Sequence, residues 1–144
     1  MDATFVLGSE SQNLTIRVLR RASEDPDYWE GNWLYAEIDV TFRSFRANVP
    51  VSLWTTDFVD FRDGLRRCYE DLAGACAFGT LEGWLAIDIT GDGRGHFDAV
   101  CTLRDDPMLS TLLKFELAFD QTELPTMLRA LDRIVQLFPV AGAP

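Results

Sequence analysis

The sequence is short of the residues from which most metal and catalytic sites are built. It holds a single histidine, His96, and three cysteines, Cys68, Cys76 and Cys101, with no CxxC pair among them. One imidazole and three scattered thiols do not have the spacing of a zinc site, so we expect no metal and no other cofactor. Cys68 and Cys101 fall on apolar faces of their segments, which indicates buried free thiols in a reducing compartment.

Basic residues are also scarce, and long apolar runs are missing. The 144 residues include 13 Lys and Arg against 23 Asp and Glu, which gives a net charge of −10. This charge suits solubility, disfavours nucleic acid and anionic membranes as partners, and favours a basic protein. No apolar run approaches the ~20 residues of a membrane span, and the N-terminus lacks the basic segment of a secretory signal. The sequence therefore predicts a cytoplasmic protein.

No motif of a known reaction centre is present. The sequence contains no P-loop, dinucleotide-binding fingerprint, nucleophile elbow or paired-histidine motif. Segment 88–96 (DITGDGRGH) resembles the start of a calcium loop, but Ala99 stands where the closing carboxylate is needed. A glycine-rich hairpin turn is the better interpretation, and His96 is then a surface residue beside that turn. We therefore expect a protein that is not an enzyme and has no catalytic residues.

What the sequence does contain is strict alternation of apolar and polar residues. This pattern predicts strands with one buried face at 14–18, 34–42, 45–53, near 75–81, and at 85–89, 97–103 and 113–119. The short turn at Arg43 and Ser44 predicts an antiparallel hairpin, and Pro50 places its strand at an edge or a bulge. We expect seven or eight strands in all.

Two segments have the apolar spacing of an amphipathic helix. Apolar residues recur every three or four positions over 58–72 and 124–138. Thr55 or Thr56 is the expected N-cap of the first helix, and Gly74 is its expected stop.

The two halves of the chain repeat one plan. With an offset of 66 residues, the strand and helix start at 49–58 align with 115–124, which indicates either an internal duplication or two amphipathic segments of the same type. The predicted fold class is α+β, a curved antiparallel sheet of about seven to eight strands packed on two amphipathic helices. No linker divides the chain, so we expect 1–144 to form a single domain with internal halves 12–74 and 75–139.

The most distinctive candidate site is an acidic and aromatic loop at 23–33 (SEDPDYWEGNW), which holds four acids and three aromatics. Trp and Tyr bury a large area at low entropy cost, so this pattern is typical of protein recognition. The candidate residues for binding a protein partner are Glu24, Asp25, Asp27, Tyr28, Trp29 and Glu30. The alternative is that the tryptophans fold inward to seal one end of the core, which is our expectation for Trp33.

Short motifs along the chain resemble the WapI-type immunity proteins, a family of small bacterial proteins. They are 28–34 (YWEGNWL), 81–85 (LEGWL), 91–96 (GDGRGH), 104–107 (RDDP) and 117–125 (LAFDQTELP), and the resemblance runs in order from about 12 to 139. The family is named for proteins that neutralise a toxin domain released by a contact-dependent surface protein. The resemblance implies a non-enzymatic protein that binds and neutralises a cognate toxin domain, and the net charge suits a basic one.

Two functions from different classes remain open. The leading hypothesis is this toxin-binding protein, as a monomer or a dimer. The alternative is a small-ligand-binding or enzymatic α+β domain with a pocket in the curved sheet, near His96 or the tryptophans. Several polar side chains converging inside the sheet would favour the alternative, whereas a filled apolar core would favour the leading hypothesis.

Overall fold

The computed structural model describes residues 3–144, which form eight strands and three α-helices. The first half contains β1 (Thr4–Gly8), β2 (Asn13–Arg21), α1 (Tyr28–Gly31), β3 (Trp33–Thr41), β4 (Arg46–Trp54) and α2 (Thr55–Asp71). The second half contains β5 (Ala73–Gly79), β6 (Leu85–Asp92), β7 (His96–Arg104), β8 (Leu112–Asp120), a 3₁₀ turn (Gln121–Glu123) and α3 (Leu124–Leu137). The predicted α+β class and strand number are confirmed.

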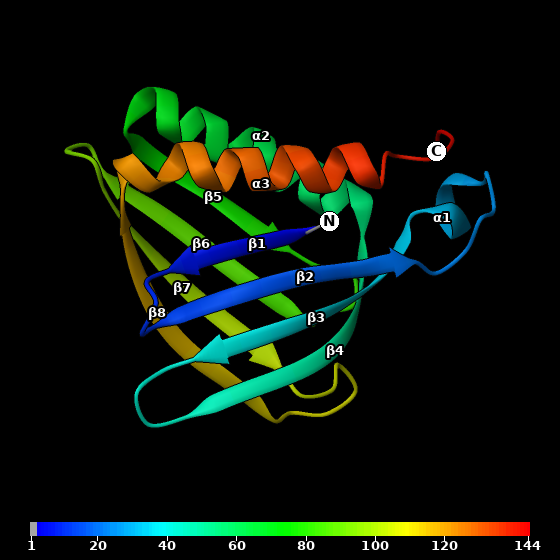
Figure 1. Ribbon diagram of the computed structural model, residues 1–144, viewed down its shortest axis with the longest axis horizontal. Coiled ribbons are helices and arrows are strands. Elements are labelled where there is room, and N and C mark those ends of the chain that lie inside the picture. The colour runs from blue at the N-terminus through cyan, green and yellow to red at the C-terminus, as the bar shows by residue number, and fades with distance from the viewer. Residues whose placement is uncertain (1–2) are drawn as a thin grey trace.

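The strands form two four-stranded antiparallel sheets, with the orders β1-β2-β3-β4 and β5-β6-β7-β8. The predicted curved sheet is thus divided between β4 and β5, because α2 carries the chain from one sheet to the other. Figure 1 shows the first sheet in front of the second with their strands crossing, while α2 and α3 run antiparallel along one side. Pro50 lies in β4, an edge strand, as predicted.

The repeat seen in the sequence is present in the structure. The two halves have the same strand order, and the 66-residue offset holds for their last strands, which begin at Arg46 and Leu112. Arg66 of α2 and Asp132 of α3 are also 66 positions apart and form an ion pair, with Nη2 3.3 Å from Oδ1. Equivalent positions therefore face each other across the helix pair, as they do beside a two-fold axis.

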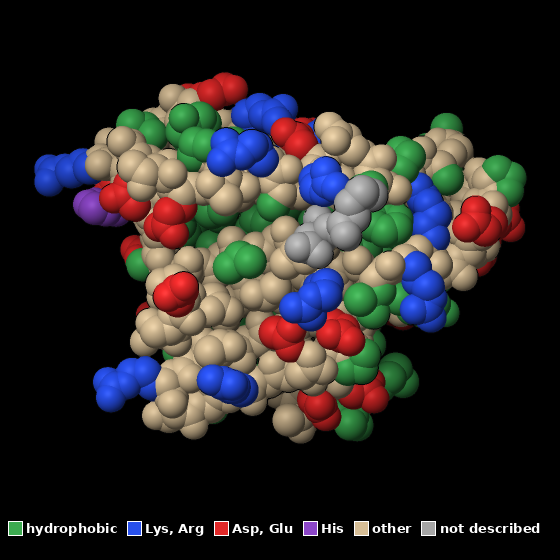
Figure 2. Space-filling view, viewed as in Figure 1, with side chains coloured by type: hydrophobic (Ala, Val, Ile, Leu, Met, Phe, Trp, Pro, Cys, Tyr) green, Lys and Arg blue, Asp and Glu red, His purple; other side chains and the backbone are tan. Residues whose placement is uncertain are grey.

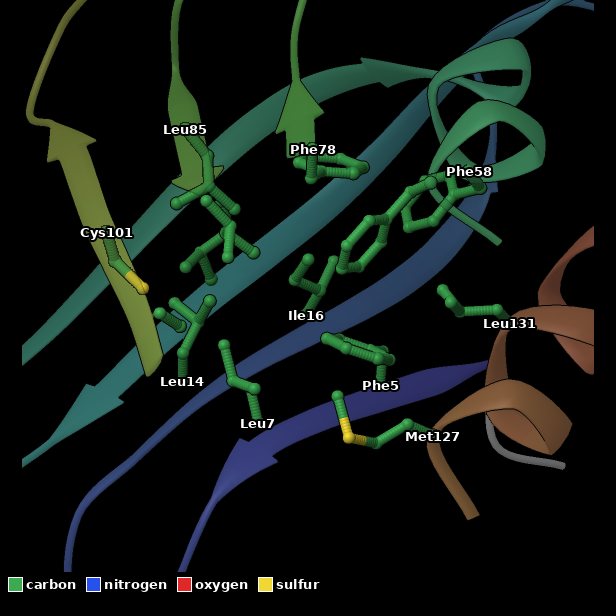
Figure 3. Packing of buried hydrophobic residues seen from close by; sticks show 14 of the residues in the cluster. Phe5, Leu7, Leu14, Ile16, Phe58, Phe78, Leu85, Cys101, Met127 and Leu131 are labelled. Carbon is green, nitrogen blue, oxygen red and sulfur yellow. The ribbon is translucent and has the colours of Figure 1, made fainter. Parts of the chain in front are cut away.

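The core is one apolar cluster that draws on both sheets and both long helices. The apolar side chains on the inward faces of the strands belong to this cluster, as the alternation predicted. Phe61 of α2 is fully buried in it, with its ring 5.5 Å from that of Phe5 in β1 and 5.4 Å from that of Phe78 in β5. Figure 3 shows Phe5 and Phe78 with Phe58 between the sheets and α2. One helix residue thus joins the edge strands of both sheets.

Both expectations for the ends of the first helix are wrong. The helix begins at Thr55, and the Trp54 N–H donates to the Asp57 carboxylate at 3.2 Å, so neither threonine is the N-cap. The helix stops at Leu72, which has a left-handed φ of 58°, and not at Gly74. Because β5 begins at the very next residue, the chain must turn at Leu72 itself.

β1 is an element that the sequence analysis did not identify. It is only five residues long, yet Phe5 and Leu7 are fully buried and its neighbour Ala3 is buried too.

Between residues 3 and 144, no helix combines the length and the apolar character needed to cross a membrane.

Replacing Phe61 tests its place in the core. Because this ring is fully buried against both edge strands, Phe61→Ala should lower the free energy of unfolding by about 3–5 kcal/mol in urea denaturation. Tyr69→Ala, on the same helix but 41% exposed, should change it by about 0.5 kcal/mol or less. Equal effects of the two substitutions would contradict the packing described.

Candidate functional site

The acidic and aromatic segment lies in the connection between β2 and β3, residues 22–32, here called the 22–32 loop. It protrudes from one end of the molecule and contains the short helix α1 (Figure 1). The equivalent connection in the second half, between β6 and β7, consists of residues 93–95 alone. No other pair of equivalent connections differs so much in length. The candidate site is thus the place where the repeat is broken.

Two aspartates of the loop organise its own backbone. The Asp27 carboxylate accepts hydrogen bonds from the N–H groups of Trp29 at 3.0 Å and Glu30 at 3.2 Å, so it caps α1. The Asp25 carboxylate accepts one from the Asp27 N–H at 2.9 Å. The side chains of Glu24 and Glu30 have no ion pair or hydrogen bond with any other described residue. Their charges are therefore available to a partner.

A buried asparagine attaches the loop to the C-terminal segment. The Asn32 side chain is fully buried, and its amide nitrogen donates to the carbonyls of Tyr28 at 2.8 Å and Ala141 at 3.0 Å. Its side-chain oxygen accepts from the Ala141 N–H at 2.7 Å. The Asn32 carbonyl accepts from the N–H of Thr55, the first residue of α2. Asn32 thus holds loop, tail and helix together.

An arginine and a close backbone contact complete this support. Arg21 donates to the Gly31 carbonyl at 2.7 Å and to the carbonyl of Pro139. A Cβ on Gly31 would lie 2.0 Å from the Asp25 carbonyl oxygen, so no larger residue fits there without a backbone shift. A loop held in this way loses little conformational entropy when it binds a partner.

The loop carries an aromatic cluster whose outermost member is Trp29, 57% exposed. The Tyr28 ring lies edge-on to both Trp29 at 5.0 Å and Trp54 at 5.3 Å. Trp54, at the end of β4, is 8% exposed and anchors the cluster to the first sheet. Trp29 is thus a large apolar side chain presented to solvent on a supported base.

The expectation that Trp33 seals the core is wrong. Trp33 is half-buried, and its ring lies 5.8 Å from that of Trp54. Because residues alternate along β3, Leu34 takes the inward position and Trp33 shares the outer face with Tyr35. Trp33 therefore belongs to the surface beside the loop.

The predicted binding residues come together on this protrusion. Glu24, Asp25, Asp27, Trp29 and Glu30 are exposed, and Tyr28 is half-buried beneath Trp29. Figure 2 shows acidic side chains at the outer tip of the lobe that carries α1 in Figure 1. Sequence reasoning missed Trp54 and the C-terminal segment, because nothing in the local pattern places them beside the loop.

One carboxylate under the cluster is perturbed. Burial is the largest influence and raises the pKa of Asp57 to about 6. The hydrogen bond that its carboxylate accepts from the Trp54 N–H acts to lower this pKa, and the nearby charge of Asp60 acts to raise it. Folding therefore favours the protonated form of Asp57.

The remaining sequence candidates lie away from the loop. The Asp92 carboxylate accepts from the N–H groups of Arg94 and His96, so the calcium-like segment is a hairpin turn. The exposed His96 lies 3.9 Å from the Asp120 carboxylate. No group of three or more His, Cys, Asp or Glu suited to a metal ion occurs within 3–144.

The cysteines are free thiols. Cys68 and Cys101 are buried as predicted, and Cys76 is half-buried. Burial raises the pKa of Cys76 and of Cys101 to about 12, so both are protonated at neutral pH.

The space between the sheets and the helices is filled by apolar side chains. At the edge of this space a hollow of about 380 Å³ opens between the sheets, beside Val49 of β4, Leu103 of β7 and Leu113 of β8. Another, of about 510 Å³, is on the outer face of the first sheet, beside Thr15, Asp39 and Asn48.

Comparison with known proteins gives a family and a fold. The model of the family described as immunity protein WapI-like matches residues 5–139. No curated protein matches the chain. The structure of WHY1 from Arabidopsis thaliana has a TM-score of 0.53 at 10% identity, covering 99% of this chain and 86% of that one. The trypanosoma bruciei MRP1/MRP2 structure has a TM-score of 0.48 at 14% identity, covering 94% and 84%. The likeness to WHY1 shows a shared fold alone.

Replacing Asn32 should loosen the loop. Asn32→Ala leaves two half-buried carbonyls without their donor, and we expect it to lower the free energy of unfolding by about 1–3 kcal/mol. Amide hydrogen exchange should rise at 28–31 and at Ala141. Asn48→Ala, on the exposed face of β4, is the control. Unchanged exchange in the loop would show that Asn32 does not hold it.

The pKa of Asp57 predicts a pH-dependent effect of its replacement. Its folded-state pKa of about 6 lies above the ordinary aspartate value of 3.8, so its contribution to stability is lost as the pH rises from about 4 to about 6. Asp57→Asn keeps an oxygen for the Trp54 N–H and cannot ionise. It should therefore stabilise the protein more at pH 7.5 than at pH 4.5, measured by urea denaturation against Glu70→Gln, an exposed acid on the same helix. The same effect at both pH values would refute the raised pKa.

Proposed function

The chain belongs to the immunity protein WapI-like family, and we propose that it binds and neutralises a cognate toxin domain of basic charge through the 22–32 loop. Membership of an immunity-protein family implies a protein partner. The basic charge of that partner and the surface that meets it are the content of our proposal.

The observation that carries the proposal is the exposed Trp29 on a supported, acidic base. Residues that dominate protein interfaces are enriched in Trp, Tyr and Arg and lie centrally, surrounded by groups that exclude water. Trp29 is an exposed residue of this type, its ring packs edge-on against Tyr28, and Glu24, Asp27 and Glu30 belong to the same loop. Asn32 and Arg21 fix the loop before any partner arrives.

The net charge of −10 supports a basic partner. Opposite potentials accelerate encounter and disfavour wrong partners, and salt weakens both effects. Neutralisation of this kind needs a surface that covers the toxin and no reaction by the protein itself. We propose that it takes place in the cytoplasm, with 1–144 acting as one domain whose core spans both halves.

A co-expression and binding experiment tests the proposal. The toxin domain encoded next to this gene should form a complex with the protein at low salt, and co-expression should relieve its toxicity. No complex at low salt, or undiminished toxicity, would refute the proposed function.

Trp29→Ala should raise the dissociation constant of that complex about thirtyfold, the effect of losing about 2 kcal/mol at a central anchor. Tyr69→Ala, an exposed aromatic residue on α2, is the matched control and should bind as the wild type does. Thermal unfolding of both variants shows whether the fold is retained. Equal binding by Trp29→Ala and the control would exclude Trp29 as the anchor.

A further inference from the structure

A groove of about 350 Å³ runs between α1 and the outer face of the first sheet. Trp33 and Tyr35 line it from alternate positions of β3, and Ser52 of β4 pairs with Tyr35. Glu30 of α1 and Glu82 of the β5–β6 connection also line it. The groove therefore combines two aromatic rings and two carboxylates from both halves of the chain.

The carboxylates of the groove differ from their neighbours on the same sheet face. Glu37 and Asp39 of β3 both pair with Arg17, at 3.3 and 3.1 Å. Glu30 and Glu82 are exposed, and neither has an ion-pair partner among residues 3–144. The groove therefore holds two carboxylates that form no ion pair with a described residue.

One aromatic ring of the groove already contacts a guanidinium group of the chain itself. The guanidinium carbon of Arg20 lies 4.8 Å from the centre of the Tyr35 ring. Trp33, the better cation-π acceptor, is half-buried on the same face. A planar guanidinium can stack on an indole while its N–H groups meet carboxylates in a fork, which the compact ammonium of lysine cannot do.

We infer that this groove binds the guanidinium group of an arginine of the partner, between Glu30 and Glu82 and against Trp33. The inference rests on the proposed function and names a contact within it. Trp29 anchors the partner at the tip of the loop, and the groove receives a charged side chain at its base.

Short peptides test the groove without the toxin. The probe is acetyl-Gly-Arg-Gly-amide, compared with the same peptide carrying lysine or citrulline, the uncharged isostere of arginine. In NMR titrations of the full chain, the arginine peptide should shift the Trp33 indole N–H and the Ser52 amide more than the lysine peptide does, and citrulline should leave them unmoved. Equal shifts with citrulline, or with lysine, would overturn the assignment.

Charge-neutralising variants locate the site. Glu30→Gln with Glu82→Gln should abolish the arginine-dependent shifts. Glu10→Gln with Glu70→Gln removes the same charge from exposed positions outside the groove and should leave the shifts intact. The inference fails if both double variants respond as the wild type does, or if both lose the shifts. Thermal unfolding of each variant reports whether it is folded.

The toxin complex separates this inference from the proposed function. The Glu30→Gln, Glu82→Gln variant should raise the dissociation constant about tenfold more than the Glu10→Gln, Glu70→Gln control does. If Trp29→Ala weakens the complex and the groove variant does not differ from the control, the groove assignment fails and the proposed function stands. If no toxin complex forms, the proposed function fails. If the arginine peptide still shifts the Trp33 signal in that case, the groove binds a guanidinium group but does not bind that toxin.

Discussion

The contact on which the structure depends is the packing of Phe61 against Phe5 and Phe78. The two sheets share no strand pair, so the connecting helix α2 and the packing of side chains set their relation to each other. Phe61 reaches both edge strands from one helix, and it thereby fixes α2 against β1 and β5. The first turn of α2 in turn places the Thr55 N–H on the Asn32 carbonyl. The candidate site is thus attached to the core through α2.

Much of the fold follows from periodicity, because a half-buried strand and an amphipathic helix each need a one-sided apolar pattern. The strands, both long helices and the repeat were predictable on this basis. The division into two sheets was not, because alternation says which face is buried and nothing about which strands pair. β1 escaped notice for a related reason, since Phe5, Val6 and Leu7 are all apolar and show no alternation, although Val6 is exposed. Leu72 takes a conformation that a sequence reader assigns to glycine, because β5 begins directly after it.

The candidate site was likewise predictable only in part. Composition singled out the acids and aromatics of the loop, and the structure places them on one protrusion. Tertiary contacts decide the rest: Ala141 hydrogen-bonds to Asn32 although the two are 109 positions apart, and Glu82 comes from the other half of the chain. Trp33 was misassigned because a large apolar residue was expected to be buried, whereas its parity in β3 puts it outside. Parity along a strand is the better guide to the direction of a side chain.

The unequal length of the two equivalent connections has an evolutionary consequence. A three-residue turn at 93–95 suffices to join β6 to β7, so the residues added at 22–32 are not needed to complete a sheet. Mutations in Glu24, Trp29 or Glu30 meet little resistance from folding, whereas Asn32 and Gly31 are constrained by their buried contacts. Selection for folding therefore acts on the base of the loop, while a change at its exposed residues alters the surface and leaves the scaffold intact.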